Sequence, residues 1–227
     1  MNRRMTQDLA HKRPYLLASL IAGISFPATW LFLPLEGGLI ALVWKMAGVG
    51  LLVPFALHRH HVGEFVPLAI ILAFYALGDG LIEFSMVAGA LAFAVGHLVA
   101  IWLYFRHRRV SPTFSQKLLA IAIFLLTPVI AYGLPPTTDE AVQVAAYSVI
   151  LAAMAAMAWS SNFPRYRVGI GAVLFVISDL LIFAELGPLA NSKVSGIAIW
   201  YLYYGGVLML ATGVVTTMVK RGHYSDA

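Results

Sequence analysis

Apolar stretches of about 20 residues recur along the whole length of this chain, separated by short segments that carry its charges and many of its prolines and glycines. A helix of that length rises ~1.5 Å per residue and crosses the ~30 Å hydrocarbon core of a bilayer. A lipid-exposed backbone must satisfy its own hydrogen bonds, and continuous apolar runs do so only as helices, whereas transmembrane strands alternate in shorter segments. The sequence therefore predicts an all-α integral membrane bundle.

Breaks between the apolar runs divide the 227 residues into eight predicted transmembrane helices, which we expect to form a single transmembrane domain over residues 1–227. These helices are predicted at 15–33, 39–57, 65–83, 86–105, 117–134, 140–159, 168–187 and 196–219. Only 11% of the residues are charged and 61% are apolar, so polar side chains are too few to cover a water-soluble globule. The first run is too long for a signal-peptide core, and we expect it to be retained.

Basic residues are distributed unevenly between the two sides of this predicted bundle. With a cytoplasmic N-terminus and eight spans, the inner segments hold Arg3, Arg4, Lys12, Arg13, Arg59, Arg106, Arg108, Arg109, Lys117, Arg165, Arg167, Lys220 and Arg221. The outer segments hold Glu36, Asp139, Glu140 and Lys193. The positive-inside rule therefore predicts two cytoplasmic termini, and the basic charge indicates topology instead of a nucleic-acid partner. The lack of cysteine and of appended soluble domains favours a bacterial inner membrane.

A short internal similarity relates the third and seventh predicted spans. The sequence DGLI at residues 79–82 recurs as DLLI at residues 179–182, and both helices are predicted to run in the same direction. A four-plus-four parallel duplication would place Asp79 and Asp179 at similar depth about a pseudo-twofold axis. A chance match of four residues with one mismatch is the alternative.

Few ionisable side chains lie inside the predicted spans, and they are Lys45, Asp79, Glu83, His97, Asp179 and Glu185. A charge in hydrocarbon costs on the order of 2.5–3.5 kcal/mol by insertion scales, so those that persist usually face a bundle interior or a wet cavity. Counted from the predicted outer ends of four different spans, Lys45, Asp79, Asp179 and His97 lie in the outer half or near the middle. The sequence therefore predicts that these four residues share one polar cavity.

Each of these side chains also has a purely structural interpretation. Glu83 lies near a span end and can touch water, and Lys45 can snorkel toward the outer headgroups along its flexible stem. His97 can bond a carbonyl of a neighbouring helix. The short side chains of Asp79 and Asp179 cannot snorkel far, and their structural alternative is a pairing with Lys45.

Two other clusters favour structural interpretations. The cluster Trp200, Tyr201, Tyr203 and Tyr204 is typical of an interfacial aromatic belt more than of a binding site. The histidine-rich run at residues 58–61 falls in an inner loop without intramembrane carboxylate partners. Because the chain has no cysteine and a single deep histidine, its core cannot build a three-histidine zinc centre. We therefore expect no metal and no cofactor.

Two carboxyl groups in one poorly solvated cavity resist ionising together, so one can stay protonated while the other is charged. This arrangement supplies a general acid beside a general base. Glycosidases use such a pair to protonate an acetal and to stabilise the oxocarbenium ion that follows, and a proton-coupled transporter can use it as a relay. These residues alone leave open a hydrolase, a proton-coupled lipid or solute transporter and a non-catalytic lipid-binding protein.

From Trp44-Lys45 to the eighth predicted span, the chain carries a series of spaced motifs. They are Gly78-Asp79, Phe93-x-x-Gly96-His97, Tyr147 with Met154, Arg167-x-x-x-Gly171-x-x-x-Phe175-x-x-Ser178-Asp179 and Tyr203-Tyr204. This series resembles the YhhN-type lysoplasmalogenase family. The chain departs from the family pattern at two places: Ala100 and Ile101 stand where a tyrosine is expected after His97, and residues 205–207 replace a glutamine after the paired tyrosines.

The resemblance implies that the chain hydrolyses the vinyl ether bond of lysoplasmalogens, releasing a fatty aldehyde and glycerophosphoethanolamine or glycerophosphocholine. Protonation of the vinyl β-carbon creates an oxocarbenium ion, water captures it, and the hemiacetal collapses to aldehyde and alcohol. Asp79 and Asp179 would divide the roles of acid and of base or cation stabiliser. The implied partners are a lysophospholipid substrate and membrane lipid.

The supporting residues expected around this pair are Lys45, His97, Ser178, Glu83, Tyr203 and Tyr204. Lys45 would hold the substrate phosphate, since an ammonium group is a natural phosphate partner. His97 would orient water, and Ser178 would hydrogen-bond within the site. A lysolipid keeps its headgroup near the surface, so a polar cavity in the outer half matches the depth of its ether linkage.

Overall fold

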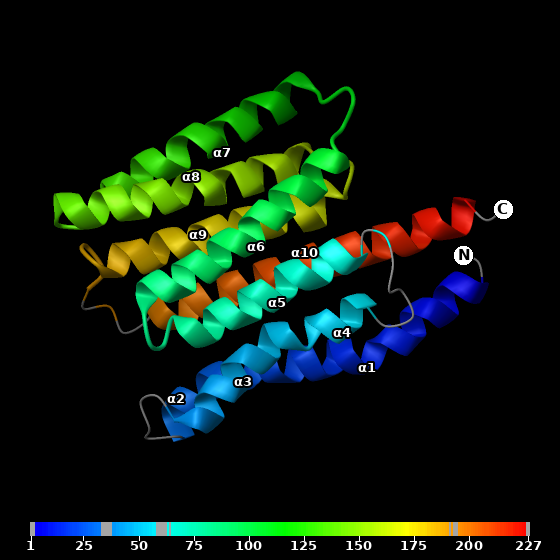
Figure 1. Cartoon of the computed structure of the whole chain (residues 1–227), viewed down its shortest axis with the longest axis horizontal. Coiled ribbons are helices and arrows are strands. Elements are labelled where there is room, and N and C mark those ends of the chain that lie inside the picture. The colour runs from blue at the N-terminus through cyan, green and yellow to red at the C-terminus, as the bar shows by residue number, and fades with distance from the viewer. Residues whose placement is uncertain are drawn as a thin grey trace. The chain divides into compact units, whose positions relative to one another are not determined.

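All regular elements are helices in the part of the chain that the structure, a computed structural model, describes: residues 3–32, 38–57, 63, 65–190, 192 and 195–225. The helices are α1 (Arg3–Ser25), η1 (Phe26–Ala28), α2 (Thr29–Phe32), α3 (Leu39–Gly50), α4 (Leu52–Leu57), α5 (Phe65–Leu81), α6 (Met86–Arg106), α7 (Phe114–Tyr132), α8 (Thr138–Ser160), η2 (Arg165–Gly169), α9 (Ile170–Glu185) and α10 (Ser195–Ser225) (Figure 1). The predicted all-α class is confirmed.

The chain divides into two compact units. Unit 1 combines Met1–Val99 with Ala211–Ala227, and unit 2 is Ala100–Leu210. The boundaries lie inside α6 and α10, so they do not coincide with a division between the fourth and fifth predicted spans. The single transmembrane domain and the four-plus-four repeat stay predictions.

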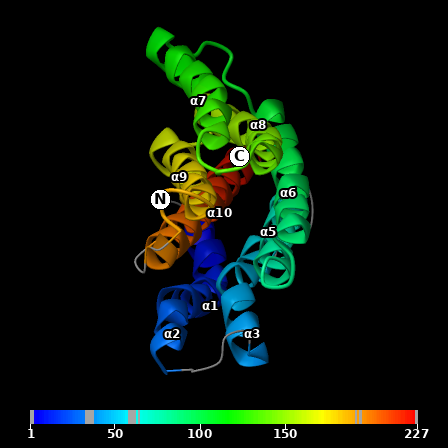
Figure 2. The same ribbon diagram turned by 90° about the vertical axis from the view of Figure 1, so that its left-hand side faces the viewer.

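In unit 1, α3 packs against both α1 and α5 (Figure 2), and α4 continues the same two contacts (Figure 1). The Ser19 hydroxyl of α1 donates to the Gly48 carbonyl of α3 at 2.6 Å. Apolar side chains such as Val49, Leu52 and Leu68 are buried. Hydrogen bonds between helices of this kind are typical of membrane bundles, where small residues let backbones approach.

The predicted second span, 39–57, is one apolar run that the structure breaks into α3 and α4 at Leu51. Pro54 is the physical reason. Its nitrogen cannot donate, and its ring clashes with the carbonyl four residues earlier, which belongs to Gly50. The run still continues as helix to Leu57, so the proline interrupts the helix and does not end the span.

Helix α1 begins at Arg3, well before the predicted start of the first span at Tyr15, and Pro14 lies inside it. The early start accompanies a buried cation: the ammonium group of Lys12 donates to the carbonyls of Phe55 and Ala56 at 3.1 and 2.9 Å. It also lies 5.3 Å from the ring centroid of Phe65. Lys12 thus caps the carboxyl end of α4, where a positive charge also complements the helix dipole.

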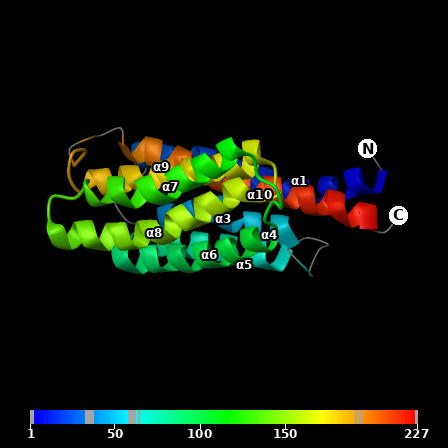
Figure 3. The ribbon, with the colours of Figure 1, turned by 90° about the horizontal axis from the view of Figure 1, so that it is seen from above.

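In unit 2, α7 and α8 lie side by side, and α9 packs against both (Figures 1 and 3). Thr137 forms the N-cap of α8, and its hydroxyl oxygen accepts a hydrogen bond from the Glu140 backbone N–H at 3.3 Å. At the start of α7, the Gln116 side chain accepts one from the Thr113 N–H at 3.0 Å. These caps satisfy backbone groups that a helix start leaves unpaired.

Six helices in the described ranges are long and apolar enough to cross a membrane: Leu39–Leu57, Met86–Arg106, Phe114–Tyr132, Thr138–Ser160, Arg165–Glu185 and Ser195–Arg221. The apolar helix Phe65–Leu81 is shorter. Large apolar side chains on the outside of these helices, such as Leu125 and Val129 of α7, are exposed. Apolar surface of this extent needs a lipid solvent, so the chain is a multi-pass membrane protein.

Candidate active site

Asp79 lies near the carboxyl end of α5 and is only 2% exposed. One turn earlier on the same helix, the Tyr75 hydroxyl is hydrogen-bonded to Nδ1 of His97 on α6 at 2.8 Å, and both residues are buried. The two rings meet edge to face, 5.2 Å apart. Tyr75 thus fixes the orientation of the imidazole. His97 is not placed to orient water through Nδ1, because that atom is already engaged.

Two glycines bring α5 and α6 together around this pair. A Cβ at Gly78 would come within 2.8 Å of the Phe93 ring, and one at Gly96 would come within 2.6 Å of the Tyr75 ring. Each glycine therefore accommodates an aromatic ring of the other helix. This reciprocal packing holds Asp79 and His97 on facing helices, and larger side chains would push the helices apart.

Lys45 of α3 forms an ion pair with Glu83, which lies in the turn between α5 and α6. The lysine side chain is 15% exposed and the glutamate side chain 41% exposed. The structure therefore pairs Lys45 with Glu83, whereas the structural alternative considered above paired it with an aspartate. The expected contact of Lys45 with a substrate phosphate requires this ion pair to open or to be shared.

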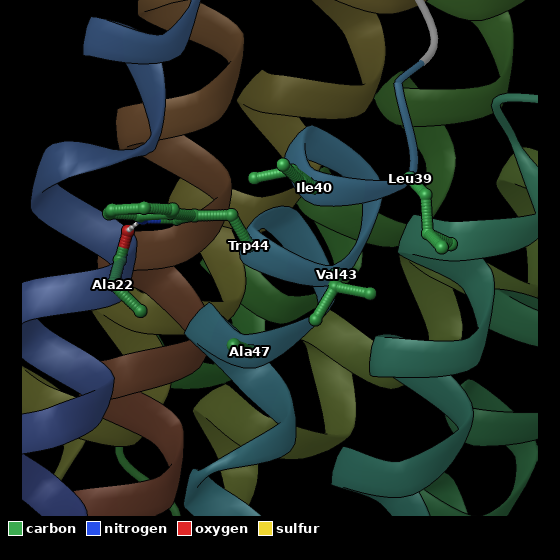
Figure 4. Close-up of a pocket in the computed structure, with 6 residues that line it drawn as sticks. All are labelled: Ala22, Leu39, Ile40, Val43, Trp44 and Ala47. Carbon is green, nitrogen blue, oxygen red and sulfur yellow. Dashed lines mark hydrogen bonds between the residues drawn. The ribbon is translucent and has the colours of Figure 1, made fainter.

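An apolar groove of about 430 Å³ lies on α1 and α3 of unit 1, lined by Ala22, Leu39, Ile40, Val43, Trp44 and Ala47 (Figure 4). The indole N–H of Trp44 donates to the Ala22 carbonyl at 3.2 Å and to the Ser25 hydroxyl at 3.1 Å. Among the described residues, those that line the groove carry no carboxyl or imidazole group. This described lining therefore supplies apolar surface without acid or base groups.

Asp179 lies on α9 in unit 2 and is 6% exposed. The Tyr147 hydroxyl of α8 donates to its Oδ2 atom at 2.8 Å. The Tyr147 ring meets the Phe183 ring edge to face at 6.0 Å, next to a small apolar cluster that includes Ala131 and Val144. One oxygen of the Asp179 carboxyl group is thus held by a phenol whose own position is set by apolar packing.

Close backbone contact between α9 and α10 positions the rest of the seventh-span motif. A Cβ at Gly171 would come within 2.6 Å of the Gly206 carbonyl oxygen, so only glycine fits there without a shift. The Ser178 hydroxyl donates to the Ile199 carbonyl at 2.9 Å. Ser178 therefore ties two helices together, and its predicted hydrogen bond within the site is replaced by this interhelical bond.

The aromatic cluster of α10 is not the interfacial belt that the sequence favoured. Trp200, Tyr203 and Tyr204 are buried, whereas Tyr201 is 44% exposed. The Trp200 and Tyr204 rings are stacked at 6.0 Å, and Tyr203 meets Phe175 of α9 edge to face at 5.1 Å. Only Tyr201 has the exposure of a belt residue, because the other three face inward from the helix.

No group of three or more potential metal-binding side chains gathers within the ranges that the structure describes. The histidine-rich run at residues 58–61 lies outside the described residues, as do Glu36 and Lys193 of the predicted outer segments. Asp79 belongs to unit 1 and Asp179 to unit 2. The groups among these described residues that can exchange protons are carboxyl, phenol and imidazole groups.

A family model described as the YhhN family matches residues 40–214. The chain belongs to the YhhN family. The match runs from α3 into α10 and leaves out α1, η1 and α2. No individual curated protein and no solved structure gives a significant match.

The residues that suggested the YhhN family from sequence divide into packing and polar groups. Gly78, Gly96 and Gly171 serve close helix contacts, and Met154 is buried in the core. Asp79, His97, Ser178 and Asp179 are the buried polar members. The structure adds two partners that sequence reasoning did not place in the site, Tyr75 and Tyr147. The signal for Tyr75 is its position one turn before Asp79, whereas nothing local connects Tyr147 to Asp179.

Proposed function

We propose that this YhhN family member is a membrane hydrolase that cleaves the vinyl ether bond of lysoplasmalogens. The observation that carries the proposal is the burial of two carboxyl residues, Asp79 and Asp179, at motif positions of apolar helices. Burying such groups is costly in a membrane and usually marks a functional site. The reaction needs only a proton donor, a base or cation stabiliser, and water.

Asp79 and Asp179 carry the proton transfers in this proposal. One protonates the β-carbon of the vinyl ether, which leaves the positive charge shared between the α-carbon and the ether oxygen. The other, as a carboxylate, stabilises this oxocarbenium ion and accepts a proton from the attacking water. The Tyr147 hydroxyl donates to Oδ2 of Asp179, which leaves Oδ1 and the second lone pair of Oδ2 for proton exchange.

Aldehyde release tests the proposal directly. Detergent-purified protein is incubated with a lysoplasmalogen, and the fatty aldehyde and the glycerophospho product are quantified in equal amounts. The matched control is the lysolipid with a saturated alkyl ether, which has no double bond to protonate. Uptake of lipid or solute into proton-loaded vesicles without aldehyde release would favour a transporter, and binding without either would favour a lipid-binding protein.

Chelation is expected to leave turnover unchanged. The chain has no cysteine, and the described residues gather no set of three metal ligands, so the proton transfers fall to carboxyl groups. The measurement is aldehyde release after incubation with a strong chelator and removal of the chelated metal. Activity that chelation abolishes and zinc restores would contradict this expectation.

We propose that α1 and α5 also cross the membrane, which raises the count to eight spans, with both termini in the cytoplasm of a bacterial cell. The 17 residues of α5 match the short end of the range for spanning helices. Reporter fusions after Ala227 and in the turn at Glu83 should give a cytoplasmic and an external signal, respectively. A reporter that places Ala227 outside would contradict both the count and the orientation.

A further inference from the structure

We propose that the ion pair of Lys45 and Glu83 is the headgroup site of the enzyme and selects zwitterionic headgroups, with Lys45 binding the phosphate and Glu83 the ammonium group. This inference rests on the proposed function for the identity of the reacting bond. The position of Glu83 near a span end indicates only contact with water. The inference gives Glu83 a role in substrate selection.

The first support is the position of the pair along α5. A Cβ at Gly80 of α5 would come within 2.7 Å of the Met46 sulfur of α3, so these two residues lie at the same level. Helix α3 runs antiparallel to α5, since Gly50 of α3 lies beside Ala76 of α5. Lys45 precedes Met46, so its stem starts near the level of the residue after Gly80, between Asp79 and Glu83. Its ammonium group reaches Glu83, four residues beyond Asp79 along the chain, or ~6 Å at helical rise.

The order of groups in the lipid matches this order in the protein. In a lysoplasmalogen, glycerol separates the vinyl ether from the phosphate, and the ammonium group lies farther out, beyond the phosphate. In unit 1, the candidate carboxyl of Asp79 is followed by the stem of Lys45 and then by Glu83 in the turn after α5. A lysolipid with its ether near Asp79 would thus bring each headgroup charge to a residue of opposite charge.

The second support is the balance of charges. A zwitterion can replace the contact between Lys45 and Glu83 by two contacts of the same kind without changing the net charge of the site. Because each charge of the pair gains a new partner of opposite charge, opening the pair leaves neither charge unpaired. An anionic headgroup would satisfy Lys45 but leave Glu83 facing a like charge, which disfavours that class of lipid.

The test compares two vinyl ether lysolipids that release the same aldehyde, one with a phosphoethanolamine headgroup and one with a phosphate monoester headgroup. Wild-type protein should have the lower KM for phosphoethanolamine. Glu83→Gln should raise that KM about 10-fold, because a charge-assisted contact is lost, and should lower the KM for the phosphate monoester. Lys45→Gln should raise the KM for both. The matched control is Glu185→Gln, which changes a carboxylate at the end of α9 that accepts a hydrogen bond from Ser195.

Exchanging the charges of Lys45 and Glu83 distinguishes a role of the ion pair in lipid recognition from a role in stability. In the double variant Lys45→Glu/Glu83→Lys the ion pair can reform, so the melting temperature should stay near that of wild type, while the preference for the zwitterion should disappear. If the pair only locks α3 to the turn after α5, the double variant will keep the wild-type preference. That result, or a Glu83→Gln variant whose two KM values change by the same factor, would overturn the inference.

A binding measurement keeps the inference separate from the proposed reaction. Lysophosphatidylethanolamine and lysophosphatidic acid, which contain no vinyl ether, are compared for their effect on the melting temperature of wild type and Glu83→Gln. Selective stabilisation of wild type by the zwitterion, lost in Glu83→Gln, supports the headgroup site even if no aldehyde is released. Aldehyde release together with equal stabilisation by both lipids rejects the headgroup site and retains the hydrolase.

Discussion

Replacement of Asp79 or Asp179 by asparagine is expected to lower aldehyde release by about 10²- to 10⁴-fold, the usual contribution of a general acid or base. Asparagine keeps the volume and polarity of the side chain but can neither donate a carboxyl proton nor carry the charge. Each variant should insert and fold, because both side chains remain hydrogen-bonding groups in the same buried positions. Turnover and melting temperature are measured on the same purified samples.

The double variant distinguishes cooperation from two separate roles. If the two carboxyl groups act in one reaction, the turnover of the double variant should be only slightly lower than that of the less active single variant. The effects of removing groups that act as a unit do not add. The control is Asp139→Asn, which changes an exposed carboxylate in the first turn of α8 and should keep wild-type turnover. Single variants of Asp79 and Asp179 that are folded and fully active would end the catalytic interpretation.

Replacement of Tyr147 by phenylalanine is expected to lower kcat by about 10- to 100-fold with little change in KM. The phenol donates to Oδ2 of Asp179, and a hydrogen bond to a charged group is worth ~1.5–3 kcal/mol, which corresponds to this range. The ring itself stays in its edge-to-face contact with Phe183, so the fold should persist. Tyr147 is a positioning residue here, because it acts through Asp179.

The kinetic constants of Tyr147→Phe are measured beside its melting temperature. Tyr132→Phe is the matched control, because Tyr132 is a half-exposed tyrosine at the end of α7. A fall in melting temperature with unchanged kcat per folded molecule would show that the hydrogen bond serves stability alone. A change in KM without a change in kcat would place Tyr147 at the substrate and not behind Asp179.

The sequence predicted most of the helices because a span is a local property. Apolar runs and their polar ends place 65–83, 86–105 and 117–134 within a few residues of α5, α6 and α7. The structure departs from these predictions where a contact between residues far apart in the sequence determines where a helix begins. Helix α1 begins at Arg3 and carries Lys12, whose carbonyl partners lie on α4. No local sequence pattern predicts these hydrogen bonds.

The candidate residues can be chosen from the sequence, but the contacts that each of them makes cannot. The cost of a charge in hydrocarbon is enough to single out Asp79, Asp179, Lys45 and His97 from one sequence. The contacts of each residue depend on how the helices pair and how each helix is rotated about its axis. The depth of a residue along its predicted span does not determine either. Lys45 therefore pairs with Glu83, and the Tyr147 contact of Asp179 was found only in the structure.

The buried ammonium group of Lys12 has a consequence for the order in which the protein is assembled. Its carbonyl acceptors lie 43 and 44 residues further along the chain, so they are synthesised after Lys12. Until α4 arrives, this cation lacks these two acceptors, and it is held more cheaply at the membrane surface than among acyl chains. Helix α1 is then expected to settle into its final position late, together with α3 and α4, even though it leaves the ribosome first.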